Sequence, residues 1–313
     1  MKNVFRSSTL LIALALLGTF FMSACDKKDD PKPVTTPTIT GVVTSDPNFS
    51  ILAAAVTRAG LADALNQPGT LTVFAPDNKA FTDAGITADV IATIPVADLA
   101  GILKYHVLGS KVMAAGVPAS DAVVTLQGQK LFASKNANGV FVNGIGVKTA
   151  DVAASNGVIH VISGVLYPPT ASIAEIASGN PEFSILLSAV VKAGLAGAAA
   201  GPGKFTVFAP TNAAFEAAGL NQAAIDAASV ETVTGIVQQH IIATNVYASD
   251  LINGATAPTL KNGATLTINT SPAGVKLTGS ANPFSNVVTT TAGTTYNITA
   301  TNGVVHVIDK VIL

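Results

Sequence analysis

TVFAPDNKAF at residues 72–81 and its copy TVFAPTNAAF at residues 206–215 are the two stretches that decide the fold. In each copy a short apolar run ends at a proline, Pro76 or Pro210. Proline has no N–H to donate to a neighbouring strand, so we expect the strand to end there. The polar pair at 77–78 then stands where it can cap a helical turn. The stretch therefore predicts, twice in the chain, a strand that runs directly into a short helix.

Two further motifs repeat around this block in the same order. They are DPNFSIL at 46–52 with NPEFSIL at 180–186, and NGVIHVI at 156–162 with NGVVHVI at 302–308. A central histidine also repeats, as His106 and His240. A repeat of about 134–146 residues has the size of a domain, which excludes short solenoid repeats. The chain is therefore predicted to fold as two domains, 38–167 and 170–313, with a stiff Pro168-Pro169 joint between them.

Within each unit, helical patterns come first and short strands follow. In the first unit, Phe49, Leu52 and Val56 recur at helical spacing, and residues 86–105 contain two helical stretches broken at Pro95. Later residues form short β-runs separated by Asn-Gly and Gly-x turns. These runs are 123–126, 130–133, 140–142 and 158–162. The order predicts an α+β unit whose antiparallel strands are closed by the early strand.

The composition excludes several classes of protein. Lys and Arg total 17 against 18 Asp and Glu, so no strong basic field is available to bind nucleic acid. One Cys and four His are too few for a disulfide scaffold or a zinc site of several cysteines, and we expect no metal and no cofactor. Hydrophobic residues make up 49% of the chain, but no apolar run after residue 25 approaches the ~18 residues of a membrane span.

The N-terminus has the pattern of a secretory signal. A basic start precedes an apolar stretch at 10–17, and small residues lead to Cys25, the single cysteine. Residues 22–25 resemble the lipobox of bacterial lipoproteins, with Met22 in place of the usual leucine. The resemblance implies a signal peptide at 1–24 and lipid attachment at Cys25. An ordinary signal peptide with an incidental cysteine is the alternative.

An acidic, proline-rich segment follows at 25–37. Its charges and prolines cannot bury a core, so we expect an extended, disordered tether. An acidic run behind a lipidated cysteine resembles the surface-export signal of Bacteroidota lipoproteins. That resemblance implies a protein anchored to the bacterial outer membrane and displayed on the cell surface. A periplasm-facing protein and a merely soluble spacer are the alternatives.

The repeated TVFAP blocks, the central histidines and the terminal Asn-Gly motifs together resemble the signature of the fasciclin-like domain. The resemblance covers residues 39–166 and 173–313. It implies two tandem α+β domains, each a β-sandwich or barrel-like core with a cluster of helices packed against it. It also implies an extracellular adhesive or interaction role without a known reaction. The structural motif residues are Phe74, Pro76, His160, Phe208, Pro210, His240 and His306.

Candidate contact residues come partly from the same resemblance. Tyr105-His106 matches a Tyr-His pair that is linked to integrin binding in animal members of the family, whereas the second domain has Gln239 in place of the tyrosine. We take Tyr105, His106 and Phe284 as the candidate contact site. Phe284 belongs to a stretch near 280–290 where the second unit is longer. The alternatives are a structural histidine at a helix end and a solvated hairpin.

Catalytic motifs such as G-x-S-x-G, H-E-x-x-H and the phosphate-binding loop are absent from the sequence. An enzyme would need His106 and His160 to meet an acid in one open cleft. We instead expect His160 and His306, inside apolar strands, to be buried, neutral and hydrogen-bonded.

The sequence therefore predicts a non-catalytic, lipid-anchored surface protein whose two domains bind an unknown protein or polysaccharide matrix. The alternative is an accessory protein that binds a glycan or small ligand for an outer-membrane uptake system. Aromatic residues make up 5% of the chain and include no Trp, which counts against sugar stacking.

Overall fold

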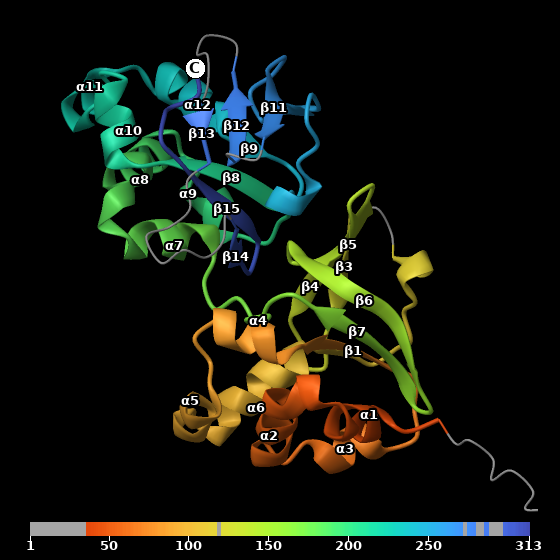
Figure 1. The fold of residues 1–313 in the computed structure, drawn as a ribbon. Helices are drawn as coiled ribbons and strands as arrows, with labels where there is room; N and C mark the ends of the chain where they lie inside the picture. The colour runs from red at the N-terminus through yellow and green to blue at the C-terminus, as the bar shows by residue number, and fades with distance from the viewer. Residues whose placement is uncertain (1–35, 118–119, 272–273, 280–284, 288–296) are drawn as a thin grey trace, which may run out of the picture. The chain divides into compact units, whose positions relative to one another are not determined.

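The computed structural model describes residues 36–117, 120–271, 274–279, 285–287 and 297–313 (Figure 1). The predicted signal peptide, Cys25, the tether up to residue 35 and Phe284 lie outside the described residues. Both predicted domains are described over most of their length.

The first domain opens with helices, as its sequence pattern predicts. They are α1 (Ile39–Ser45), the 3-10 turn η1 (Pro47–Phe49), α2 (Ser50–Arg58), α3 (Ala62–Asn66), α4 (Asn78–Asp83), α5 (Ala88–Thr93) and α6 (Val96–Tyr105). Asp46 caps η1 by accepting a hydrogen bond from the Asn48 N–H, and Pro47 occupies the first position, where no N–H is needed. The break between α5 and α6 falls at Pro95, which confirms the predicted position.

The strands of the first domain form one sheet of seven in the order β2-β1-β7-β6-β5-β4-β3. They are β1 (Leu71–Pro76), β2 (Val107–Leu108), β3 (Ser120–Val124), β4 (Lys130–Asn136), β5 (Gly139–Val142), β6 (Ile145–Ala154) and β7 (Gly157–Ile162), with the 3-10 turn η2 (Ala114–Gly116) after β2. The early strand β1 does close the sheet, but it lies parallel to β7, whereas the other neighbouring strands are antiparallel.

The sequence pattern predicts neither the two-residue strand β2 nor the ten-residue strand β6. Asp151 has a φ of 61°, and the register of β6 against β7 shifts on both sides of Thr149. Such bulges bend the strand and interrupt the alternation of inward and outward side chains by which a strand is recognised in sequence.

The second domain repeats this order of elements. Its helices are α7 (Ile173–Gly179), η3 (Pro181–Phe183), α8 (Ser184–Lys192), α9 (Ala196–Ala200), α10 (Asn212–Ala217), α11 (Gln222–Ala227), α12 (Val230–Gln239) and η4 (Ala248–Asp250). Its strands are β8 (Phe205–Pro210), β9 (Ile241–Ile242), β10 (Thr256–Pro258), β11 (Thr265–Ser271), β12 (Gly274–Thr278), β13 (Ser285–Asn286), β14 (Ile298–Ala300) and β15 (Gly303–Ile308). They form the sheets β10-β11-β12-β13 and β14-β15-β8-β9, with β8 parallel to β15.

Strand β1 separates two packed cores within the first domain. Val73 and Ala75 pack among the helices, while Phe74, on the opposite face of the strand, packs among the strands. The second domain divides in the same way at β8, where Val207 packs among the helices and Phe208 among the strands. Burying a phenylalanine side chain contributes about 1.5–3 kcal/mol relative to leaving it exposed. Each domain thus packs its helices against one side of its strands, which form one sheet in the first domain and two in the second, and both have the predicted α+β fold (Figure 1).

Among the described residues, no single helix has the length and apolar character needed to cross a membrane. One sharply bent pair, Ile39–Ser45 with Pro47–Arg58, meets both criteria only when the two are taken together across a bend of 99°.

Candidate functional site

The central histidines tie the end of a helix to the end of the domain. The His106 Nδ1 atom lies 2.9 Å from the Ile102 carbonyl oxygen, and its Nε2 accepts a hydrogen bond from the Leu166 N–H at 2.9 Å. Because Nε2 accepts, Nδ1 carries the proton and the ring is neutral. Burial lowers the pKa of His106 to about 4. Both ring nitrogens are engaged by the backbone, so neither is free to act on a substrate.

His240 repeats this arrangement in the second domain. Its Nδ1 lies 2.7 Å from the Ile236 carbonyl oxygen, and its Nε2 accepts from the Ile312 N–H at 2.8 Å. Burial lowers the pKa of His240 to about 4 as well. The two rings therefore connect equivalent backbone segments of the two domains through the same pair of hydrogen bonds.

The histidines of the terminal motifs lie in the cores of their domains. His160 is 2% exposed, and its Nε2 lies 2.8 Å from the Val112 carbonyl oxygen. His306 is 0% exposed, and its Nε2 lies 2.8 Å from the Val246 carbonyl oxygen. Each ring stacks on the phenylalanine of the neighbouring parallel strand, with centroids 5.5 Å apart for Phe74–His160 and 5.4 Å apart for Phe208–His306. His106 and His160 do not meet in an open cleft.

The Asn-Gly pairs before these strands act through contacts distant in sequence. The Asn156 Oδ1 accepts from the Ile39 N–H at the start of α1, and its Nδ2 donates to the carbonyl oxygens of Leu65 and Gln67, each at 2.8 Å. Asn302 makes the corresponding three bonds in the second domain. One amide therefore holds three segments of its domain together.

The glycine of each pair is required by close packing rather than by backbone conformation. Glycine after asparagine often supplies a positive φ in a turn, but neither Gly157 nor Gly303 has a positive φ. A Cβ at Gly157 would collide with the Leu71 carbonyl oxygen, and one at Gly303 with the Phe205 carbonyl oxygen. The glycine lets the two parallel strands pair at this point.

Tyr105 has no exposed surface with which to contact a partner, since it is 0% exposed. Its hydroxyl donates to the Lys130 carbonyl oxygen and accepts from the Asn143 Nδ2, each at 2.9 Å. Burial raises its pKa to about 12. His106 is only 3% exposed. This geometry corrects the expectation of a contact patch formed by these two side chains. The corresponding Gln239 is also buried, at 1% exposed, so neither domain presents a Tyr-His patch.

Replacing Tyr105 with phenylalanine should therefore lower stability and leave partner binding unchanged. The substitution leaves the Lys130 carbonyl and the Asn143 amide without their partner, which we expect to cost about 1–3 kcal/mol of unfolding free energy. Chemical denaturation measures that loss. Tyr167→Phe is the matched control, because Tyr167 is 51% exposed and should change by less than about 0.5 kcal/mol. Reduced cell or matrix binding by a folded Tyr105→Phe protein would restore a contact role.

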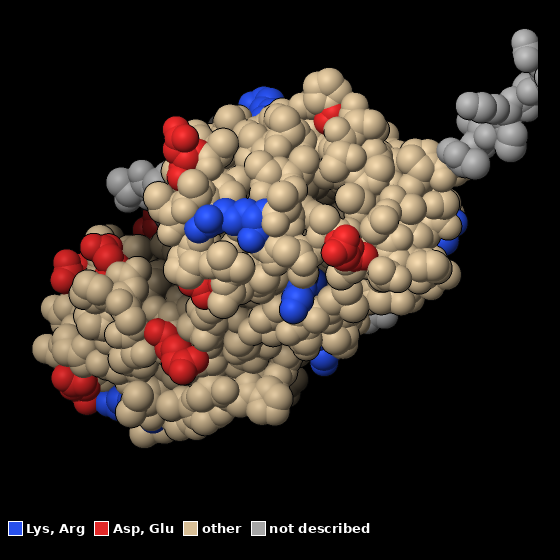
Figure 2. All heavy atoms as spheres, turned by 90° about the horizontal axis from the view of Figure 1, so that it is seen from below, with Lys and Arg blue, Asp and Glu red and all other residues tan. Residues whose placement is uncertain are grey.

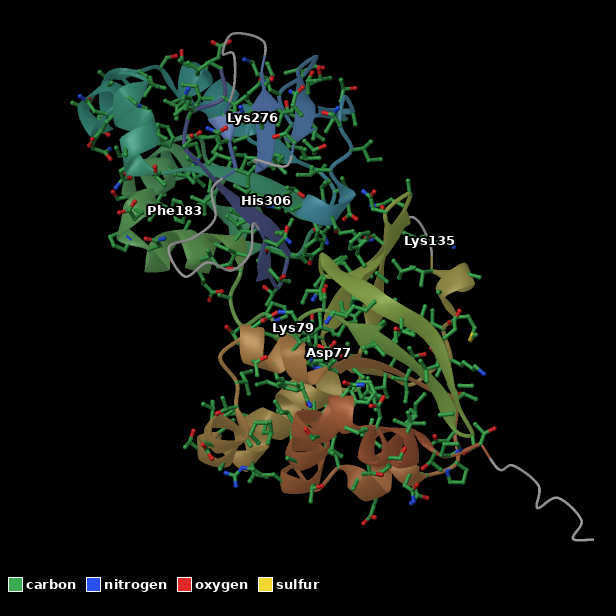
Figure 3. All side chains as sticks on the ribbon, viewed as in Figure 1. Asp77, Lys79, Lys135, Phe183, Lys276 and His306 are labelled. Atoms are coloured by element: carbon green, nitrogen blue, oxygen red, sulfur yellow. The ribbon has the colours of Figure 1, made fainter. Side chains whose placement is uncertain are left out.

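Charged side chains are sparse and form no reactive cluster in the described part of the chain. On the face in Figure 2 they occur as small separate groups on a largely uncharged surface. Lys148 pairs with Asp77 at 2.6 Å, and Lys79 with Asp83 at 2.8 Å. Asp77, labelled beside Lys79 in Figure 3, caps α4. Within the described residues, no three His, Cys, Asp or Glu side chains are placed to hold a metal ion.

Burial alone would raise the pKa of the Asp77 carboxyl group. The hydrogen bonds from the Lys148 ammonium and the Ala80 N–H outweigh that effect, so the pKa lies below its usual value. Asp77 is therefore an ionised capping residue with two partners, which is a structural arrangement.

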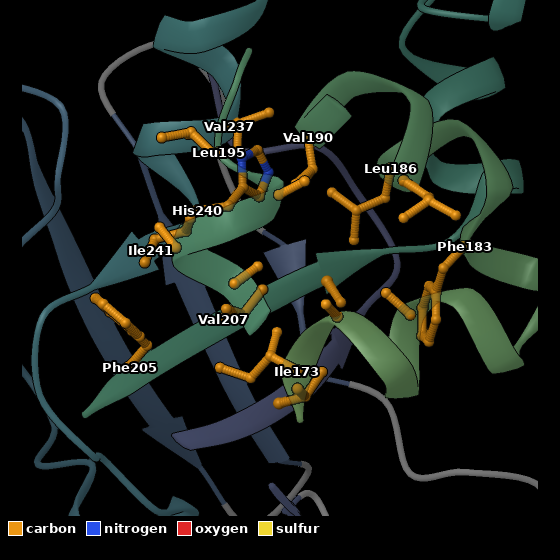
Figure 4. A pocket seen from close by; sticks show the side chains of 18 of the residues that line it. Ile173, Phe183, Leu186, Val190, Leu195, Phe205, Val207, Val237, His240 and Ile241 are labelled. Carbon is orange, nitrogen blue, oxygen red and sulfur yellow. The ribbon is translucent and has the colours of Figure 1, made fainter. Parts of the chain in front are cut away.

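Each domain contains an apolar pocket between its first helices and its first strand. The pocket of the second domain, shown in Figure 4, is lined by residues such as Ile173, Leu186, Val207 and Ile241. His240 borders it, but both of its ring nitrogens are occupied by the backbone. The first domain has its pocket at the equivalent position. Sequence patterning did not reveal these pockets, since apolar residues with helical spacing predict a filled core equally well.

The sequence similarity between this chain and other proteins lies in these two domains. The sequence model of the fasciclin domain matches residues 47–168 and 181–313. Transforming growth factor-beta-induced protein ig-h3 of Sus scrofa is 41% identical over 132 residues, covering 42% of this chain and 19% of that protein. Protein sll1483 of Synechocystis sp. is 42% identical over 134 residues, covering 42% of this chain and 74% of that protein. Periostin of Homo sapiens is 28% identical over 222 residues, covering 70% of this chain and 25% of that protein.

A solved structure, the FAS1 domain pair from the insect cell adhesion molecule fasciclin I, aligns with a TM-score of 0.42 at 18% identity, covering 84% of this chain and 95% of that one. The chain spans only a minor part of the length of ig-h3 and of periostin. The fasciclin match, by contrast, extends over well more than half of the chain, in two copies that include the repeated motifs. The chain therefore belongs to the fasciclin domain family.

Proposed function

We propose that this chain is a lipid-anchored surface protein that uses two fasciclin domains for adhesion to a protein or polysaccharide matrix. Membership of the family supports the adhesive role, since fasciclin domains act in cell adhesion and matrix interaction. The observation that carries the proposal is the duplicated framework in which the histidines are bonded to the backbone. Such a framework supports presentation of a surface rather than chemistry on a substrate.

The anchor and the location rest on the N-terminal sequence. The resemblance of residues 22–25 to a lipobox supports acylation of Cys25, and the acidic run behind it supports export to the outer surface. Two or three acyl chains hold a protein durably on a bilayer, whereas a single chain binds reversibly. Two modules on one tether raise the effective concentration of the second contact once the first has formed, so weak individual contacts can suffice.

The glycan-binding alternative has less support. Sugar recognition commonly uses exposed aromatic rings, and among the aromatic side chains of the described residues only Tyr167, at 51%, is exposed. A non-catalytic role also fits the described residues better than an enzyme. Both ring nitrogens of His106 and of His240 are bonded to the backbone.

The proposal is tested on intact cells of the source bacterium. Protease added outside the cells should degrade the full chain, and a Cys25→Ala variant should no longer sediment with membranes. Cells without the protein should attach less well to their matrix, and the full chain should restore attachment. A chain that is protected in intact cells but degraded after lysis would exclude surface display. Unchanged attachment in the deletion strain would exclude the adhesive role.

A further inference from the structure

The apolar pockets occupy the same place in both domains. Every residue lining the first pocket, apart from Phe74 and Lys104, has a counterpart 134 positions later that lines the second. Examples are Ile39 with Ile173, Val56 with Val190, and Leu126 with Leu260. The cavity volume is about 300 Å³ in the first domain and about 80 Å³ in the second. The pocket is therefore a feature of the framework that both domains share, and the two copies differ in its volume.

A leucine stands exposed at the rim of each pocket. Leu126 is 50% exposed and Leu260 is 37% exposed. Each is held in place by its own N–H, which donates at 2.8 Å to the carbonyl oxygen of Val107 and of Ile241, respectively. Exposed apolar side chains beside an apolar cavity are typical of ligand-binding sites. The rim leucines provide apolar surface that a ligand would cover.

The interior of the first pocket has almost no free polar group with which a water molecule could form a hydrogen bond. Its lining is almost entirely apolar, and the nitrogens of its one histidine, His106, are bonded to the Ile102 carbonyl and the Leu166 N–H. A cavity lined by such side chains stays dry and takes up apolar guests, as an engineered cavity of about 150 Å³ does with benzene. A volume of 300 Å³ lies at the lower end of ligand pockets, which begin at about 300 Å³, and suits one alkyl chain.

A single charged side chain borders the first pocket. Lys104, in the last turn of α6, is exposed and belongs to the lining of this pocket. The second domain has Gln238 at the equivalent position, and Gln238 does not line its pocket. A lysine places an ammonium group in water while its methylene stem lies along apolar surface. This combination matches a ligand with an alkyl chain and an anionic head.

We propose that the pocket of the first domain binds a free fatty acid, with the alkyl chain in the cavity and the carboxylate at Lys104. The second pocket, smaller and without the lysine, does not hold this ligand. The proposal does not depend on the adhesive role or on the lipid anchor.

The test uses the full chain with Cys25→Ser, so that no acyl group of its own can compete, in buffer without detergent. Calorimetric titration with dodecanoate, below the concentration at which it forms micelles, should show one saturable site. Ala64→Phe places a ring at an exposed position of the pocket lining and should weaken binding at least tenfold. Ala54→Phe is the matched control, because Ala54, on α2, is also exposed and lines neither pocket. It should bind as the parent does.

Two further variants avoid any change in the core. Leu126→Gln at the exposed rim should weaken binding several-fold. Lys104→Gln should weaken dodecanoate binding by about threefold, the scale of an exposed ion pair, and leave dodecanol binding unchanged. Lys111→Gln, at another exposed lysine, controls for net charge.

Binding without saturation would overturn the proposal that this pocket binds a fatty acid. So would equal affinity in Ala64→Phe, Leu126→Gln and Ala54→Phe. Equal losses for dodecanoate and dodecanol in Lys104→Gln would overturn the assignment of the carboxylate.

Discussion

Acidification from pH 7 to pH 4 should lower the free energy of unfolding of each domain by about 3 kcal/mol through its central histidine alone. Burial lowers the pKa of His106 and of His240 from 6.5 to about 4. The backbone N–H groups of Leu166 and Ile312 occupy the Nε2 lone pairs, so protonation also breaks a hydrogen bond. Each pH unit between the two pKa values is worth about 1.4 kcal/mol.

The direction follows from proton binding. Between pH 6.5 and about pH 4 the unfolded chain has protonated these histidines, whereas the folded chain keeps them neutral. Stability therefore rises with pH across this interval. The contribution is fully present above pH 6.5 and is lost as the pH falls towards 4.

The measurement is urea unfolding followed by circular dichroism at several pH values. His106→Gln should be less stable than the parent at pH 7 and should show a flatter pH dependence for the first domain. His240→Gln is the matched variant for the second domain, and the double substitution should flatten both. A parent protein whose stability does not change between pH 7 and pH 4.5 would contradict the buried neutral state. So would a His106→Gln variant with the same slope as the parent.

Features set by local sequence were predictable. The order of helices and strands, the break at Pro95 and the strand that ends at Pro76 depend on residues within one turn or one strand. The repeat of motifs then predicts two domains with one fold, and the family match covers both. Strand β6 was missed because its bulges around Thr149 remove the alternation on which strand prediction depends.

Features set by distant contacts were not predictable in this way. The burial of Tyr105 depends on Asn143 and on the carbonyl of Lys130, which the sheet brings beside the end of α6. A tyrosine next to a histidine has the same local sequence whether it faces solvent or a core. The first pocket likewise requires α3, β1 and Leu126 to meet in space, and the second requires α9, β8 and Leu260; in neither domain does one stretch of sequence contain all three. Phe284 and Cys25 stay predictions, since they lie outside the described residues.

Replacing Gly157 with alanine should prevent the first domain from folding stably. In the parallel pair of β1 and β7, Gly157 lies opposite Leu71. An added Cβ would collide with the Leu71 carbonyl oxygen and lie 3.0 Å from the Ile39 Cδ1. The colliding atom belongs to the backbone of a strand that is paired to β7, so it cannot turn away as a flexible side chain could. Relief requires the two strands to separate where Asn156 ties them to α1.

Overpacking of a core usually costs about 1–3 kcal/mol, and we expect at least the upper end here because the strand pair itself must move. That is a large share of the ~5–15 kcal/mol that stabilises a typical domain. Thermal unfolding and hydrogen exchange of β1 and β7 measure the loss.

Gly69→Ala is the matched control, because a Cβ at Gly69 meets no atom within 4 Å and Gly69 has no positive φ. It should be neutral or slightly stabilising, since alanine restricts the unfolded chain more than glycine. Gly303→Ala should reproduce the large effect in the second domain, where the Phe205 carbonyl takes the place of Leu71. If Gly157→Ala and Gly69→Ala were equally stable, the close approach of β1 and β7 would not explain why glycine follows asparagine in both motifs.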